Sequence, residues 1–259
     1  MKNRAIATSC AGLITGLVLL VQGTAAQNSD ISVISSNGIQ GALEKILPEY
    51  ERTSGQHIAI VYGASAVLKR DIEGGKAFDL AILTPAVIDD LIKTGKIAAG
   101  SRTDLARTDL AVGIRAGAPK SDISTADALK QRLLAAKSIT YSKEGASTAA
   151  FDAMISRLGI ADAVKPKTVL QTVSGRPSAS VAEGENEIVL APASEIMPIR
   201  GMQLLGLLPA EFQSPIVMTA GIGAQSQKRD AAKALVEFLA SPKAVAAIKA
   251  SGMEPIARK

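Results

Sequence analysis

The sequence predicts an α/β protein built as two αβ lobes. After Asp30, short apolar runs alternate with amphipathic helical patterns, and this alternation is typical of parallel strands joined by crossover helices. A longer apolar run begins at Thr108, and the alternation restarts after it. No long linker, low-complexity tract or internal repeat separates the two halves. Two αβ units in series indicate two lobes with a cleft between them.

The first unit is expected to contain three strands, each followed by a helix. The strands are "ISVIS" (31–35), "HIAIVY" (57–62) and "FDLAILT" (78–84), and the helices are "GALEKILPEYERTSG" (41–55), "ASAVLKRDIEGG" (64–75) and "TPAVIDDLIKTGKI" (84–97). Pro48 is expected to interrupt the first helix and Gly55 to close it. Thr84 and Pro85 have the residue types of an N-cap and a first helical residue.

The second unit repeats the pattern and is followed by a C-terminal pair of helices. Strands are expected at 108–119, 138–142, 167–172, 187–191 and 214–224, and helices at 125–137, 147–159, 177–184 and 229–240. A last helix opens with Ser241 and Pro242 as cap and first residue and ends at Gly252.

The N-terminal stretch has the three parts of a secretory signal peptide. The basic start "MKNR" precedes an apolar run of eleven residues, Ala11 to Val21, and the small residues of "GTAA" follow it. The run is shorter than the roughly 20 helical residues that cross a bilayer core. We therefore expect residues 1–26 to be cleaved and the mature chain to be exported. Cys10 precedes the apolar run instead of ending it, which argues against a lipoprotein signal.

Composition narrows the possible functions. The chain of 259 residues is 47% hydrophobic and 20% charged, and its formal net charge of +5 becomes +3 when Lys2 and Arg4 are removed. Aromatic residues make up 3% and tryptophan is absent, so there is no stacking platform for bases or sugars. The mature chain would have no cysteine, and its one histidine is His57. Disulfides, zinc sites and nucleic-acid partners are therefore disfavoured.

Four predicted strand-to-helix junctions share the same chemistry. Each has small residues and hydroxyls directly before a helix, at "SSNGIQG" (35–41), "YGAS" (62–65), "KEGAST" (143–148) and "SGRPS" (174–178). A helix start leaves backbone N–H groups unpaired and carries about half a positive charge. One such junction is an ordinary N-cap. Four of them, two in each predicted lobe, indicate an anion-binding cleft.

The sequence lacks a recognisable catalytic constellation. Ser65 in "GASAV" lacks the second glycine of the G-x-S-x-G elbow, and no serine is followed by lysine at the third position. "GAPKSDIS" lacks the spacing of a phosphate-binding P-loop. The acid pairs Asp89–Asp90 and Glu185/Glu187 are expected on solvated faces or loops. The sequence therefore predicts a binding protein rather than an enzyme.

The order of several segments resembles the solute-binding receptors of ABC importers, most closely the periplasmic molybdate-binding group. The firmest part is "GALEKILPEYERTSGQHIAIVYGASAVLKRDIEGGKAFDLAIL", and "LAVGIRAGAP", "RLGIADAVKPK" and "VEFLASPKAVAAIKASG" add to it. The resemblance implies a type II periplasmic-binding-protein-like fold of two mixed, mainly parallel sheets flanked by helices. Lobe 1 would contain 27–111 and 216–259, and lobe 2 would contain 112–215, with the ligand at the hinge.

The same resemblance implies a monomeric periplasmic receptor that passes molybdate or tungstate to an inner-membrane ABC permease, without a cofactor or metal. By position, Ser65 matches a binding serine of the family, and Ser147 lies in a loop whose backbone amide contacts the anion. The expected ligand-binding set is Ser36, Asn37, Gly38, Ser65, Ser147, Gly175 and Arg176.

Two departures from the family bear on the ligand. Gly38 stands where the family usually has a hydroxyl, and Ala191–Pro192 stand where a tyrosine often completes the site. Each hydrogen bond lost to a charged group corresponds to about 1.5–3 kcal/mol. A cleft of donors alone favours a fully deprotonated dianion over hydrogen phosphate, unless Glu144 supplies an acceptor. Arg176 would instead favour a carboxylate through bidentate pairing.

Other functions stay open at this point. Sulfate, phosphate and a small carboxylate are alternative ligands for the same fold. A secreted hydrolase that uses Ser65 or Ser147, and a partner-binding module with a degenerate cleft, are functions of other classes.

Overall fold

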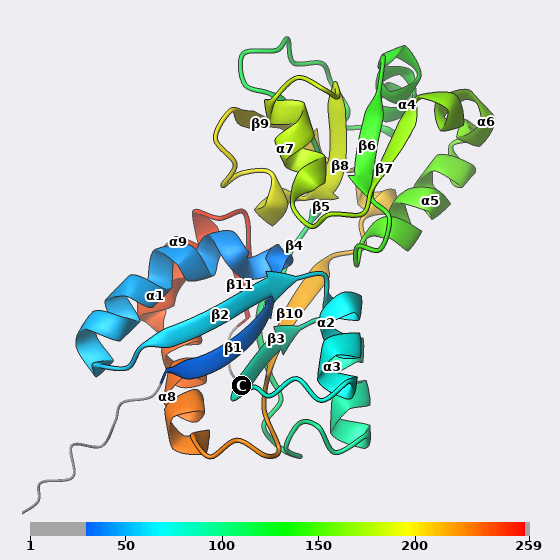
Figure 1. The fold of residues 1–259 in the computed structure, drawn as a ribbon. Helices are drawn as coiled ribbons and strands as arrows, with labels where there is room; N and C mark the ends of the chain where they lie inside the picture. Colours follow the sequence, from blue (N-terminus) through cyan, green and yellow to red (C-terminus); the bar gives the residue numbers. More distant parts are fainter. Residues whose placement is uncertain (1–29, 257–259) are drawn as a thin grey trace, which may run out of the picture.

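The computed structural model describes residues 30–256 and arranges them in two lobes, each built around one sheet (Figure 1). The predicted signal peptide, residues 1–26, lies outside the described residues. Within residues 30–256, no helix is long and apolar enough to cross a membrane. Lobe 1 contains both ends of the described chain, and lobe 2 contains its middle.

Lobe 1 has a six-stranded mixed sheet in the order β11-β4-β10-β3-β1-β2. Its strands are β1 (Ile31–Ser36), β2 (Ile58–Gly63), β3 (Leu80–Leu83), β4 (Thr103–Thr108), β10 (Ile216–Ile222) and β11 (Glu254–Pro255). β1 runs parallel to β2 and β3, whereas β10 runs antiparallel to β3 and β4. The parallel part is the β-α-β unit predicted for the first third of the chain.

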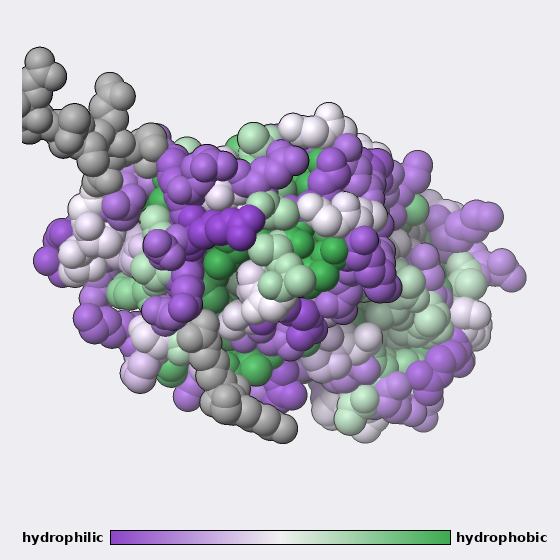
Figure 2. Space-filling model, turned by 90° about the horizontal axis from the view of Figure 1, so that it is seen from below, coloured by the Kyte–Doolittle hydropathy of each residue, from purple (hydrophilic) through white to green (hydrophobic). Residues whose placement is uncertain are grey.

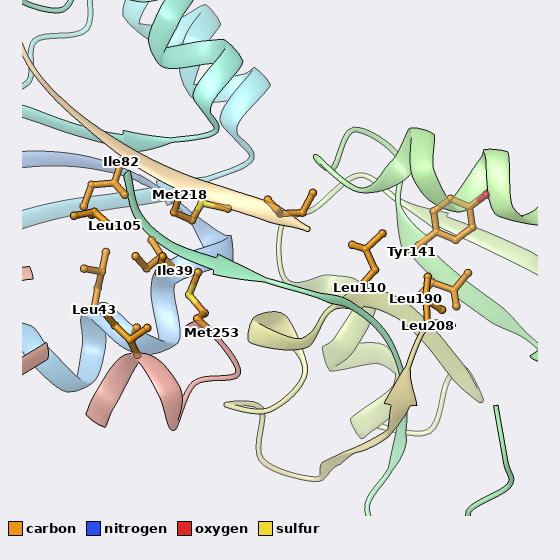
Figure 3. Packing of buried hydrophobic residues seen from close by; sticks show 14 of the residues in the cluster. Ile39, Leu43, Ile82, Leu105, Leu110, Tyr141, Leu190, Leu208, Met218 and Met253 are labelled. Atoms are coloured by element: carbon orange, nitrogen blue, oxygen red, sulfur yellow. The ribbon is translucent and has the colours of Figure 1, made fainter. Parts of the chain in front are cut away.

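Helices cover both faces of this sheet, because its strands are apolar on both sides. Val33 and Ile82 pack in the cluster on one face, and Ile34 and Leu83 pack in the cluster on the other, as the two-residue period of a strand requires. The first face carries α1 (Gln40–Ser54), α8 (Arg229–Leu239) and α9 (Pro242–Lys249), and the second carries α2 (Ser65–Glu73) and α3 (Pro85–Lys93). Figure 3 shows Ile39, Leu43 and Ile82 among the side chains of the first cluster.

Lobe 2 has a five-stranded sheet in the order β7-β6-β8-β5-β9. Its strands are β5 (Leu110–Arg115), β6 (Ile139–Ser142), β7 (Thr168–Gln171), β8 (Ile188–Pro192) and β9 (Met202–Leu207). On one face lie α4 (Ala126–Ala135), α5 (Thr148–Arg157) and α6 (Ala161–Val164), with α7 (Arg176–Ala182) on the other. The short 3-10 turns of the chain are η1 (Asn37–Ile39), η2 (Lys165–Lys167), η3 (Ala193–Glu195) and η4 (Ala210–Phe212).

The crossings between the lobes lie beside β4 and β10. β4 ends at Thr108 and β5 begins at Leu110, so the first crossing is at Asp109, slightly before the expected boundary after residue 111. The second crossing lies between β9 and β10, which begins at Ile216. The crossing strands add antiparallel pairs to both sheets, and parallel pairing is confined to β1–β3 and to β6–β8.

The structure differs from the sequence-based expectation at several elements. β4, β9 and β11 were not predicted. β4 (TDLART) and β11 have few apolar residues, whereas β9 (MQLLGL) lies in an apolar run that the sequence analysis left unassigned. The interruption expected at Pro48 is wrong: α1 continues through it. Pro48 is exposed, so water can satisfy the carbonyl that loses its helical partner. On the face shown in Figure 2, hydrophilic side chains cover most of the surface and apolar ones gather near the middle.

Candidate functional site

A cavity lies between the two lobes, beside the crossing strands. It leaves a volume of about 40 Å³ for the centres of water molecules, which corresponds to about three waters. Most of the residues that line it are small or carry a hydroxyl. They are Ser36, Asn37, Gly63, Ala64, Ser65, Ser142, Gly145, Ala146, Ser147, Ser174, Gly175, Pro177, Leu190, Ala191, Pro192, Glu195, Ile216 and Met218.

The cavity lies where several parallel strands end. β1 ends at Ser36, β2 at Gly63, β6 at Ser142 and β8 at Pro192, and all four residues line it. In α/β sheets the carboxyl ends of parallel strands are the usual ligand-binding edge. Here two such edges, one from each lobe, face each other across the same small space.

Two hydroxyls from lobe 1 are oriented by backbone amides. The Ser36 hydroxyl oxygen accepts a hydrogen bond from the Gly38 N–H at 3.3 Å, and that of Ser65 accepts one from the Thr84 N–H at 3.2 Å. Both serines are buried. A hydroxyl that accepts in this way still has its own proton to donate. Both side chains can therefore donate to a group in the cavity.

Each lobe also directs a helix start at the cavity. α2 begins at Ser65 after Ala64, and α5 begins at Thr148 after Ser147, and neither start has a side-chain cap. The amides of the first turn lack partners within the helix, and the helix dipole adds positive potential there. Ser147 is buried, and its hydroxyl makes no hydrogen bond within residues 30–256. These groups can bind an anion without a cationic side chain.

Contacts across the cleft hold the lobes together. The Asn37 side-chain amide donates to the Ser174 hydroxyl, and Arg70 of α2 pairs with Glu144 of lobe 2 at 3.0 Å. The Oδ1 atom of Asn37 is buried without a partner among the described residues. An added group could complete the hydrogen bonding of this amide. The two-lobed arrangement is thus a closed one.

Among residues 30–256, Glu195 is the single ionisable residue that lines the cavity. It ends η3, which directly follows β8. The Ala193 N–H donates to the Asp109 carbonyl at 2.9 Å, and the Ser194 N–H donates to the Thr108 hydroxyl at 3.2 Å. These bonds join η3 to the first crossing between the lobes, so Glu195 sits at the hinge.

The Glu195 side chain is half-buried and borders the cavity. It makes no hydrogen bond or ion pair within the described part of the chain. Burial disfavours its charged form and raises its pKa from the ordinary 4.5 to about 7. Glu195 can therefore be protonated or ionised near neutral pH, and the expectation of a cleft with donors alone is wrong.

The structure brings most of the predicted site residues to one cavity. Ser36, Asn37, Ser65, Ser147 and Gly175 line it. The related family usually has a hydroxyl at the position of Gly38. In this structure the hydroxyl of Ser36, two residues earlier, lines the cavity.

Two members of the predicted set lie elsewhere. Gly38 is not among the lining residues, and a Cβ there would meet the Met218 Cε atom, the flexible end of that side chain. Arg176 does not line the cavity either, because Glu183 at 2.6 Å and Glu185 bind its guanidinium. It is therefore not free to pair with a carboxylate ligand.

The one candidate acceptor that the sequence offered lies outside the cavity. Glu144 is 55% exposed in its ion pair with Arg70 and does not line the cavity. The acid that does line the cavity is Glu195, and the sequence analysis missed it. The signal was present in "EIVLAPASEI", where an acidic residue follows the carboxyl end of a buried strand. Within residues 30–256, no group of three His, Cys, Asp or Glu residues could hold a metal ion.

Residues 31–254 match the family of bacterial extracellular solute-binding proteins, and the chain belongs to this family. Its two mixed sheets and interlobe cavity have the type II periplasmic-binding-protein architecture that the sequence predicted. The Azotobacter vinelandii periplasmic molybdate-binding protein superposes with a TM-score of 0.74, at 20% identity, over 89% of this chain and 100% of that chain.

Two curated relatives differ in the function that their names state. Aconitate isomerase from Pseudomonas sp is 30% identical over 232 residues, which is 87% of this chain and 88% of the relative. Molybdate-binding protein ModA from Azotobacter vinelandii is 25% identical over 249 residues, which is 94% of this chain and 97% of the relative. The family is therefore clear, whereas the two relatives point to different small molecules.

Proposed function

We propose that the mature protein is a periplasmic receptor that captures a small oxyanion, with molybdate and tungstate as first candidates, and delivers it to the permease of an ABC importer. The observation that carries the proposal is the composition of the cavity. Hydroxyls and helix starts from both lobes converge on it, and no cationic side chain of the described residues lines it. Such donors stabilise negative charge by hydrogen bonds and helix dipoles.

The size of the closed cavity supports a compact ligand. Its volume of about 40 Å³ for water centres leaves room for about three waters, so a large acid requires the lobes to part. We expect the receptor to act as a monomer that opens and closes at the strands beside Asp109. Sulfate, phosphate and small carboxylates are the alternative ligands, and Glu195 gives phosphate a partner that the sequence analysis had not found.

A binding panel tests this function. The mature chain, residues 27–259, is titrated with molybdate, tungstate, sulfate, phosphate and citrate while its melting is followed, with sodium chloride at matched ionic strength as the control. A ligand present at about 100 times its Kd adds about 2.7 kcal/mol of stability if it binds the folded form alone. We expect stabilisation by molybdate and tungstate at micromolar concentrations. No shift with any of the oxyanions would refute the proposal.

A second candidate function is isomerisation of a small unsaturated acid. Glu195 and the relative named aconitate isomerase favour it. A carboxyl with a pKa near 7 can remove and return a proton at neutral pH, and removal of an allylic proton allows a double bond to change its geometry. The Glu195 carboxylate would take the proton from the methylene carbon and return it to the other end of the allylic system.

Deuterium exchange separates this candidate from the receptor. The protein is incubated with trans-aconitate in D₂O, and proton NMR follows the appearance of the cis isomer and the loss of the methylene signal. If the protein is an isomerase, both changes occur, and Glu195→Gln abolishes them while Glu211→Gln does not. Exchange no faster than in a protein-free control refutes the isomerase.

A further inference from the structure

The charges at the cavity are unusual for an anion site. The lining contains no lysine, arginine or histidine, and its one ionisable group is an acid. If Glu195 were ionised beside a bound anion, two negative charges would face each other in a space that holds about three waters. Like charges at such a distance disfavour the ionised form. A bound anion therefore favours the protonated carboxyl.

We propose that anion binding is coupled to one proton, which the closed protein holds between the Glu195 carboxyl and an oxygen of the anion. This inference rests on the proposed function as an anion receptor. In this proposal, Glu195 distinguishes a protonated anion from a fully deprotonated one. The complex holds one shared proton in either case. The protonated carboxyl can donate it to a dianion, or the carboxylate can accept it from a monoprotonated anion.

The proton balance depends on the anion. Molybdate and sulfate are fully deprotonated at neutral and mildly alkaline pH, so their capture by ionised Glu195 takes one proton from solvent. Hydrogen phosphate carries that proton already, and its capture under the same conditions takes up none. The pKa of about 7 for the Glu195 carboxyl without ligand supports the coupling, because this carboxyl then titrates near neutral pH.

The other charged groups near η3 do not face the cavity. η3 packs against η1, which has no ionisable residue, and against β5, whose one ionisable residue, Arg115, donates to the Ala182 carbonyl at 3.3 Å. Asp109 and the Arg107–Glu254 ion pair line a separate groove, together with Ala193. At the interlobe contacts, Arg70 and Glu144 neutralise each other. Glu195 is thus the group that sets the pH dependence.

Calorimetry of the mature protein tests the coupling. Molybdate and sulfate are titrated at pH 6 to 9, and at pH 8.5 in two buffers that differ in their enthalpy of ionisation. We expect uptake of about one proton per anion at pH 8.5. The association constant should fall by nearly tenfold for each pH unit above 7, as linkage of a single proton requires. Hydrogen phosphate, if bound, should show no uptake at pH 8.5.

Variants assign the proton to its site. Glu195→Gln keeps a neutral side chain of similar shape, and its affinity for molybdate should not vary between pH 7 and 9. Glu211→Gln, which changes an exposed glutamate in the same lobe, should retain the wild-type dependence.

The failure of the coupling and that of the receptor function are distinguishable. Binding of molybdate or sulfate by the wild-type protein without proton uptake and without pH dependence overturns the coupling and leaves the receptor function intact. Absence of binding by any of the three anions overturns both. The wild-type measurement decides this even if Glu195→Gln does not fold.

Discussion

The raised pKa of Glu195 predicts that the ligand-free protein loses stability between about pH 4.5 and pH 7. Below pH 4.5 the carboxyl is protonated in the folded and the unfolded chain, and it has no effect on the difference between them. As the pH rises, the unfolded chain ionises first, because its pKa keeps the ordinary value of 4.5 while the folded value is about 7. The unfolded chain then binds fewer protons, so the free energy of unfolding falls with pH.

The magnitude follows from the two pKa values. Their difference corresponds to about 3 kcal/mol, which is lost in full above pH 7. Glu195→Gln removes this penalty. It should therefore raise the stability of the ligand-free protein at pH 8 by up to about 3 kcal/mol, which corresponds to roughly 6–12 °C in Tm for a chain of this size. At pH 4.5 the same substitution should have little effect.

Urea denaturation at pH 4.5, 6 and 8 measures this effect, with Glu211→Gln as the matched control. The control glutamate is exposed and has no ion pair in the described structure, so its variant should follow the wild-type protein at each pH. The reasoning is refuted if Glu195→Gln and Glu211→Gln have the same stability relative to wild type at pH 8, because the Glu195 carboxyl would then be solvated in the folded protein.

Three further substitutions test the site and its surroundings. Ser147→Ala should weaken anion binding by about 1.5–3 kcal/mol, or roughly ten- to a hundredfold, as measured by calorimetry. The free energy of unfolding in urea should change by less than about 0.5 kcal/mol, because the hydroxyl has no partner in the described protein. Arg70→Ala removes an ion pair whose side chains are 60% and 55% exposed, so the affinity should change by less than about 1 kcal/mol, and the change should shrink further in 1 M salt. Gly113→Ala would bring a Cβ within 2.7 Å of the Val189 Cγ1 atom and 2.9 Å of the Ile196 Cγ2 atom; overpacking of this kind should cost about 1–3 kcal/mol in denaturation, and an unchanged midpoint would mean that these side chains can move aside.

Local signals were sufficient to predict the order of most elements. The apolar runs that became β1, β2 and β3 pair in a parallel arrangement, and the helix starts at Pro85 and Pro242 are where proline predicted them. These features depend on interactions within a few residues, namely the fixed φ of proline and the period of apolar side chains. A sequence contains such information directly. Thr84 and Ser241 precede the two helices but make no side-chain cap hydrogen bond.

The same local signals did not predict which strands pair with each other. β4 has few apolar residues, and its pairing with β10 makes it a strand. β9 is an apolar run, but nothing in that run says that it pairs with β5 at the edge of the second sheet. The run from Thr108 read as one element, yet Asp109 separates strands of two different sheets. Sequence periodicity says which face of a strand is buried, but it does not say which strand lies beside it.

The same division applies to the site. The sequence by itself determined that hydroxyls and helix starts would be present in both halves of the chain, because caps and strand ends are local. The tertiary structure decided which of them face one cavity: Ser36 lines it, Gly38 does not, and Arg176 is bound by its own acidic neighbours. It also decided the role of Glu195. The pKa of a carboxyl depends on how much water the surrounding lobes exclude, and that is set by segments that are far from it in the sequence.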